Sequence, residues 1–184
     1  METLRAWRAG VQRRRGLRLS EPGPGMPPLS WIGEERIAIS GVPSAGSVAR
    51  LAEQGVTHIV NCRSRVQVRL SGDLAAEWTA FGPARVAHAP MWDFGRRQRP
   101  RLWADAVCFA ARVLAEDPQG RVLIHCSAGR RRSPMLAYAV LRLRGRTASE
   151  AASLVLSFRR GAELVPAYVQ SVEQWLAGEQ ERGR

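Results

Sequence analysis

Cys126 and Arg132, which lie six positions apart, are the two residues of this chain best suited to chemistry. Residues 122–124 are an apolar run that predicts a buried strand ending just before Cys126. A turn of small and basic residues follows, and Ser133-Pro134 opens a predicted helix. Such a strand, turn and helix point several backbone N–H groups and the positive end of the helix dipole into one concavity, which suits a tetrahedral oxyanion.

This arrangement predicts a nucleophile beside an anion site. Arg132 can fold back and hold two oxygens of the anion in a bidentate fork. The same positive field stabilises a thiolate, so that Cys126 can act as a nucleophile at neutral pH. A thiolate next to a site for a tetrahedral oxyanion indicates chemistry on phosphate esters.

The residues around this pair form a pattern shared with a known family. The chain has His125-Cys126, then five residues, then Arg132-Ser133. This pattern resembles the signature of the cysteine-dependent protein tyrosine phosphatases, and residues 31–175 resemble their dual-specificity branch. The resemblance implies two-step hydrolysis of a phosphate monoester through a phosphocysteine intermediate, without a metal or other cofactor.

The resemblance also implies a role for each residue of the signature. Cys126 is expected to attack phosphorus, and Ser133 to hydrogen-bond the sulfur and help it leave in the second step. His125 is expected to orient the loop through a backbone hydrogen bond rather than to transfer protons. The phosphate is expected to lie among the residues of the loop, which are Ser127, Ala128, Gly129, Arg130, Arg131 and Arg132.

A proton donor is also needed, because an alkoxide or phenolate is a poor leaving group. The family takes this acid from a loop upstream of the cysteine. Asp93 follows the predicted strand 85–89 and lies 33 residues before Cys126 (126 − 93), which matches that position. The other aspartates are weaker candidates for this acid. Asp105 falls inside a predicted helix, Asp73 lies far upstream, and Asp117 lies in a turn.

Alternating patterns predict an α/β fold from about residue 31. The predicted strands are 36–40, 57–62, 85–89 and 121–125, and the predicted helices are 47–53, 73–80, 102–116, 134–143, 147–159 and 166–177. Thr147 and Glu150 form a capping box for one of these helices. We expect a single domain with a central, mostly parallel sheet flanked by helices. Ligand sites in such sheets lie at the carboxyl ends of the strands, where Cys126 is placed.

Cys62 ends the predicted strand 57–62, so parallel pairing with 121–125 would bring it to the same sheet edge as Cys126. Some relatives resembling this chain protect an oxidised nucleophile with a cysteine at a matching strand end, which makes Cys62 a candidate redox partner. The alternative is that Cys62 is a small buried apolar residue, as we expect for Cys108. Three cysteines in an ordinary globular composition favour a reducing, cytoplasmic setting.

The chain has a formal net charge of +12, and all 28 of its basic residues are arginine. This uniformity indicates a bias in codon usage as much as a binding surface. The arginines are spread along the chain without a zinc spacing or an aromatic-interleaved basic stripe, so specific nucleic-acid binding is not expected. There is also no apolar run of about 18 residues that could span a membrane.

Residues 1–28 differ from the rest of the chain. They are rich in arginine and end in a Pro/Gly-rich breaker, which predicts a disordered tail before a catalytic domain at 29–180. Leu4, Trp7 and Val11 have helical spacing, so the alternative is a short basic helix that contacts an anionic membrane.

The substrate is predicted only as a class. Arg130, Arg131 and the basic run at 96–101 predict an electropositive site. A phosphorylated protein is narrowly preferred over an anionic lipid phosphate, such as a phosphatidylglycerophosphate or a phosphoinositide. A non-catalytic phospho-binding module is the third hypothesis. It would require the loss of Cys126, Arg132 or Asp93, and all three are present.

Overall fold

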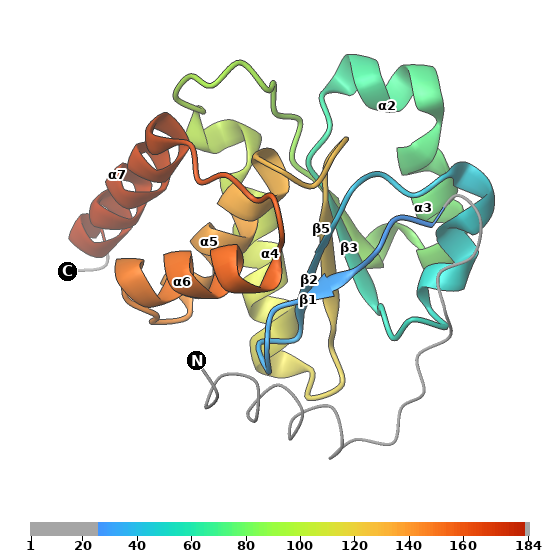
Figure 1. Ribbon diagram of the computed structural model, residues 1–184, viewed down its shortest axis with the longest axis horizontal. Helices are drawn as coiled ribbons and strands as arrows, with labels where there is room; N and C mark the ends of the chain where they lie inside the picture. Colours follow the sequence, from blue (N-terminus) through green and yellow to red (C-terminus); the bar gives the residue numbers. More distant parts are fainter. Residues whose placement is uncertain (1–25, 183–184) are drawn as a thin grey trace.

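The computed structural model describes residues 26–182. The predicted basic tail, residues 1–28, therefore lies outside the described residues except for its last three positions, of which Met26 is buried. From there the chain forms one α/β domain, in which a single sheet lies between two layers of helices (Figure 1). The predicted fold class is confirmed.

The middle strand of the sheet is β5 (Val122–His125), which is hydrogen-bonded to β2 (Ile37–Ser40) and to β3 (His58–Asn61). β4 (Val86–His88) extends the sheet beyond β3, and β1 (Ser30–Trp31) extends it beyond β2. β1 runs antiparallel to β2, and the other four strands are parallel. All four residues of β5 are buried, as expected of a strand covered on both faces.

Two helical layers cover the sheet. One contains α4 (Ala104–Glu116) and α5 (Arg132–Leu143), against which α6 (Ala148–Phe158) and α7 (Pro166–Arg182) pack. The other contains η1 (Ala45–Leu51), α2 (Arg65–Ser71), α3 (Asp73–Phe81) and η2 (Pro83–Arg85), while η3 (Pro100–Leu102) leads into α4. Val122 and Ile124 belong to the core on the α4–α5 face and Leu123 to the core on the α3 face, as strand alternation requires.

The predicted elements agree with the structure in kind but differ at their ends. All four predicted strands are present, and each is one or two residues shorter than expected. The predicted helix 47–53 is the 3₁₀ helix η1, which ends at Leu51. α5 begins at Arg132, two residues before the predicted start, and α7 continues to Arg182. The placement of Cys108 in the core was wrong, because this residue is exposed on α4.

α2 was not predicted, because none of its seven residues is buried and it therefore has no apolar stripe facing the core. A local signal was nevertheless present. Ser64 and Gln67 form a capping box at the start of α2, and Gly72 ends the helix in the left-handed conformation with φ 69°. None of the helices within residues 26–182 has the length and apolar character needed to cross a bilayer.

The start of α6 is held by the predicted capping box. The Thr147 hydroxyl accepts a hydrogen bond from the Glu150 amide at 3.2 Å, and the Glu150 carboxylate accepts one from the Thr147 amide at 2.8 Å. These contacts satisfy two N–H groups that would otherwise have no partner within the helix.

Thr147→Ala should therefore lower the free energy of unfolding by about 1 kcal/mol. Ser149→Ala is the matched control, because Ser149 is an exposed residue of the same first turn that does not cap the helix. Urea denaturation of both variants measures the difference. An equal loss of stability in the two variants would contradict the assignment of Thr147 as the cap.

Candidate active site

β5 and α5 are joined by residues 126–131, which we call the Cys126 loop. The loop lies at the carboxyl edge of the sheet, where Figure 1 shows it between α2 and the segment that follows β4. Residues 89–99 of that segment contain Asp93 and are called the Asp93 loop. The structure thus brings residues from three separate parts of the chain to one edge of the sheet.

Gly129 allows the Cys126 loop to turn tightly. Its φ is 66°, a conformation that residues with a side chain rarely adopt. A Cβ at this position would also lie 2.6 Å from the backbone of Ser40 and would collide with the guanidinium of Arg159. Only glycine fits here, and its amide donates to the Cys126 sulfur at 3.2 Å.

Arg159 holds the Cys126 loop from outside. Its guanidinium donates to the carbonyls of Gly129 at 3.0 Å and Ala128 at 3.2 Å, and also binds the carbonyl of Pro28 and the hydroxyl of Ser30. Because the C=O and the following N–H of a trans peptide point in opposite directions, fixing these carbonyls outward turns the next amides inward. Arg159 therefore contributes to the orientation of the amide groups around the sulfur.

Cys126 is buried, and its sulfur accepts hydrogen bonds from the Ser133 hydroxyl at 3.3 Å and from the Gly129 amide. Burial by itself raises the pKa of the Cys126 thiol. The hydrogen bonds from Ser133 and Gly129 and the positive charge of Arg132 outweigh burial, so that the pKa is lowered from its ordinary value. The site therefore favours a thiolate at this position.

Arg132 is only 2% exposed, and most of its guanidinium is bound by the protein. One terminal nitrogen donates to the side chain of Gln67 at 2.8 Å and to the carbonyls of Met91 and Cys62 at 3.2 and 3.3 Å; the other donates to the Ser127 hydroxyl at 3.1 Å. Nε of Arg132, by contrast, has no hydrogen-bond partner among the described residues. A buried, unpartnered N–H of a charged group marks a place for an anion.

Asp93 lies across this position from the loop above it. One carboxylate oxygen is 3.7 Å from Nε of Arg132, and the other accepts a hydrogen bond from the Tyr168 hydroxyl at 3.2 Å. Burial, together with the charge of Asp93, raises the pKa of Tyr168, so that this phenol remains a donor. The Tyr168 oxygen also accepts from the Gly95 amide at 3.1 Å, which ties the Asp93 loop to α7.

His125 is held differently from the expectation. Its Nε2 lies 2.7 Å from a carboxylate oxygen of Glu77, with both side chains fully buried, and its Nδ1 has no hydrogen-bond partner within the described part of the chain. The predicted backbone hydrogen bond from this side chain is therefore not present. The reason is that α3 places a carboxylate against the end of β5, and the imidazole binds that group instead.

Asp73, Glu77 and His125 come close enough together to suggest metal ligands. The amide nitrogen of Asn61, however, lies between the carboxylates and donates to Asp73 at 2.9 Å and to Glu77 at 3.1 Å. Arg63 pairs with Asp73 at 2.8 Å. The carboxylates are thus joined by N–H donors, and the cluster is better explained as a hydrogen-bond network that supports the sheet edge.

The side chains of Arg130 and Arg131 bind partners outside the Cys126 loop. Arg131 pairs with Glu163 at 2.8 Å, and Nε of Arg130 donates to the carbonyl of Gly161 at 3.4 Å. Both side chains therefore contact the segment after α6. This segment supplies Glu163, an ion-pair partner of Arg131 that the sequence around the loop did not reveal.

Cys62 lies next to the Cys126 loop. β3 and β5 are parallel neighbours with Asn61 opposite His125, and the Cys62 amide donates to the His125 carbonyl at 2.8 Å. Cys62 is fully buried. Burial, with a further contribution from the nearby Cys126, raises the pKa of Cys62 well above its ordinary value, so this thiol stays protonated.

Four residues of the site were missed by sequence reasoning: Gln67, Glu77, Arg159 and Tyr168. Each reaches the site from an element that is separated from the signature in the sequence. Gln67 had the one usable signal, its capping box with Ser64, which predicts a helix but not a contact with Arg132.

Comparisons with known proteins find similarity in structure but not in sequence. No family model matches the chain, and no curated protein sequence matches it. The solved structure of PTPMT1 superposes with a TM-score of 0.68 at 18% identity, covering 84% of this chain and 98% of that chain. Tk-PTP in its active form gives 0.64 at 24% identity, covering 86% and 98%, and human DUSP28 gives 0.65 at 22% identity, covering 88% and 99%.

Removal of the hydroxyl that binds the sulfur should weaken the thiolate. In Ser133→Ala the pKa of Cys126 should rise, since a hydrogen bond that stabilises the thiolate is lost. Alkylation by iodoacetamide follows the thiolate, so its pH midpoint should move upward and its rate at neutral pH should fall. Peptide mapping restricts the measurement to Cys126.

Ser47→Ala is the control, because Ser47 is a buried serine of η1, outside the site. An unchanged midpoint in Ser133→Ala would contradict the role of this hydroxyl in lowering the pKa.

Proposed function

Because the chain has the fold of the cysteine-dependent protein tyrosine phosphatase superfamily, shared with dual-specificity phosphatases, we propose that it hydrolyses phosphate monoesters. The observation that most strongly supports this proposal is the buried guanidinium of Arg132, whose Nε has no hydrogen-bond partner in the described chain and faces the same site as Cys126. A dianionic phosphoryl group supplies the missing hydrogen-bond acceptor.

In the first step, the Cys126 thiolate attacks phosphorus in line with the departing oxygen. The S–P bond forms as the P–O bond to the leaving group breaks, and Asp93 transfers a proton to the departing oxygen. Arg132 and the inward amides of the Cys126 loop stabilise the charge on the equatorial oxygens. Tyr168 supports Asp93 in a position from which it reaches the leaving group.

In the second step, Asp93 removes a proton from water as the water oxygen attacks the phosphocysteine. The P–S bond breaks, and inorganic phosphate leaves. The Ser133 hydroxyl, 3.3 Å from the sulfur, donates to the thiolate as it departs. These roles need no metal, and they use Cys126, Arg132, Asp93 and Ser133 together.

Two classes of substrate fit this chemistry. A phosphorylated protein side chain is the candidate that the sequence narrowly favours. An anionic lipid phosphate is the second, and the stacked, exposed rings of Trp92 and Phe94 on either side of Asp93 support it. Among the similar structures, PTPMT1 was solved in complex with PI(5)P, at 18% identity to this chain. A non-catalytic phospho-binding module is disfavoured, since nucleophile, arginine and acid are all present.

Cys126→Ser should reduce hydrolysis of p-nitrophenyl phosphate at least about a hundredfold, because a serine hydroxyl is not ionised at neutral pH. Asp93→Asn should slow alkyl phosphates by about a hundredfold or more and p-nitrophenyl phosphate far less, because an activated leaving group does not need protonation. Initial rates across a series of leaving groups measure both effects.

Asp105→Asn is the matched control for the acid, since Asp105 is an exposed aspartate in the first turn of α4. A uniform loss across the series in Asp93→Asn, or equal damage from Asp105→Asn, would assign the proton donor to another residue. Turnover retained by Cys126→Ser would overturn the proposed mechanism.

We also propose Cys62 as a redox partner of Cys126. Hydrogen peroxide oxidises a low-pKa thiolate to a sulfenic acid, and a neighbouring thiol can displace its hydroxyl as water to form a disulfide. Mild peroxide should therefore produce a Cys62–Cys126 link and an inactivation that dithiothreitol reverses. Cys62→Ser should lose this reversibility, whereas Cys108→Ser, which changes an exposed cysteine, should behave as wild type.

Intact mass and peptide mapping distinguish the outcomes. If Cys126 reaches sulfinic acid at the same rate in wild type and Cys62→Ser, Cys62 is only a buried apolar residue.

A further inference from the structure

Large apolar side chains are exposed on both sides of the Cys126 loop. Val66 and Leu70 belong to α2, and Trp92 and Phe94 belong to the Asp93 loop. Leu70 is 83% exposed and Phe94 70%. Figure 1 shows α2 and the Asp93 loop projecting from the same edge of the sheet, with the end of β5 between them. We call these two projections the rim.

α2 presents an amphipathic surface to solvent. Val66 and Leu70 are four positions apart and lie on one side of the helix, next to the pair Arg65 and Arg69. None of the residues of α2 is buried, whereas Gln67 reaches inward to Arg132. The helix is therefore attached to the site by one face and leaves an apolar and basic face uncovered.

The Asp93 loop presents its rings from an anchored backbone. Trp92 and Phe94 stack with ring centres 5.5 Å apart and planes 6° apart. The Trp92 carbonyl accepts hydrogen bonds from Gln98 at 3.1 Å and from Tyr168 at 3.4 Å. Two aromatic rings are thus held in exposed positions. Apolar rings are more favourably buried in water, so their exposure here indicates a binding surface.

The charge of the rim is strongly positive. The rim and the residues directly flanking it, 63–72 and 90–103, contain seven arginines and a single carboxylate, that of Asp93. Arg63 pairs with Asp73, and Arg97 binds the neutral amides of Gln170 and Gln174. The remaining five have no carboxylate partner within residues 26–182: Arg65, Arg69, Arg96, Arg99 and Arg101.

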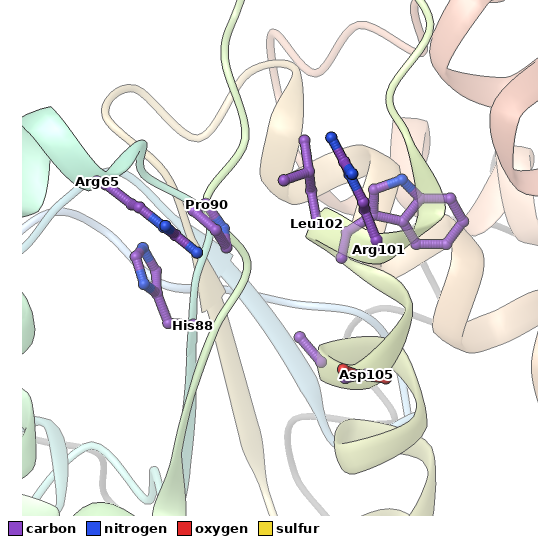
Figure 2. Close-up of a pocket in the computed structure, with 8 residues that line it drawn as sticks. Arg65, His88, Pro90, Arg101, Leu102 and Asp105 are labelled. Carbon is purple, nitrogen blue, oxygen red and sulfur yellow. The ribbon is translucent and has the colours of Figure 1, made fainter.

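A pocket of about 200 Å³ lies beside the rim, and its lining includes Arg65 of α2 and Pro90 of the Asp93 loop. Figure 2 shows Arg65, His88 and Pro90 on one side of this pocket and Arg101 and Asp105 on the other. Two guanidinium groups against one carboxylate leave the pocket net positive. It can therefore receive an anionic group beside the apolar side chains of the rim.

We propose that the rim docks on an anionic phospholipid bilayer. Val66, Leu70, Trp92 and Phe94 enter the interface, and the arginines contact head-group phosphates, as amphipathic basic surfaces do on anionic membranes. Two separate projections of mixed apolar and basic character suit a planar, deformable surface. If the proposed function holds, docking presents the Cys126 loop to phosphate monoesters in lipid head groups, which selects the second of the two substrate classes.

The test uses the full chain and vesicles of phosphatidylcholine, with or without about 30% phosphatidylglycerol. Sedimentation should show binding only to the anionic vesicles, and this binding should weaken as salt is raised. Val66→Ser with Leu70→Ser should weaken it by about tenfold or more, because two apolar side chains no longer enter the interface. Trp92→Ser with Phe94→Ser should do the same.

The control is Leu156→Ser, which changes a residue of α6 that is 48% exposed, close to the 52% of Val66, and far from the rim. It should bind as wild type. Arg65→Gln with Arg101→Gln should reduce the preference for anionic vesicles. Cys126→Ser should still bind anionic vesicles, which separates docking from catalysis. Val66→Ser with Leu70→Ser should keep wild-type activity on p-nitrophenyl phosphate.

Three results would overturn the proposal: no binding to anionic vesicles, binding by the rim variants equal to wild type, or equal loss in Leu156→Ser. The second would place membrane contact elsewhere in the chain. Binding of acidic phosphopeptides that depends on the same apolar residues, without vesicle binding, would assign the rim to a protein partner.

Discussion

The positive charge of Arg132, buried without a carboxylate in hydrogen-bonding contact, is the constraint on which the site depends. Removing a guanidinium from water costs several kcal/mol unless acceptors and a counter-charge replace the solvent. Four acceptors bind its terminal nitrogens, and Nε remains without one in the described chain. An Asp93 carboxylate oxygen lies 3.7 Å from Nε, beyond hydrogen-bonding distance, and the charge of Arg132 also lowers the pKa of the Cys126 thiol. The buried guanidinium therefore favours both a thiolate nucleophile and an anion bound beside it.

The backbone around this charge is shaped by close contacts. Gly129 approaches Ser40 so tightly that no side chain can stand there, and Arg159 binds the outward carbonyls of the loop. The outcome is a loop in which the Gly129 amide donates to the sulfur. Arg159 also reaches Pro28 and Ser30, so the first residues of the domain help to position a loop about a hundred residues later in the chain.

Sequence reasoning succeeded where the determining interactions are local. The apolar run before Cys126, the glycine of the turn and the capping box at Thr147 are each recognisable within a few residues, and the strands and α6 are present accordingly. It failed where a side chain's contacts depend on a residue far away in the sequence. Arg131 pairs with Glu163, His125 binds Glu77, and the apolar residues Val66 and Leu70 of α2 face solvent instead of the core.

By itself, then, the sequence determined the fold class, the order of strand, turn and helix around Cys126, and the pairing of that cysteine with Arg132, because these follow from periodicity and short spacing. The tertiary structure alone decided which side chains complete the site. Gln67 lies 65 positions from Arg132, and Tyr168 lies 75 positions from Asp93. Contacts at such separations arise only when parallel strands align their carboxyl ends and the helices pack around them, and no local pattern in the chain encodes that packing.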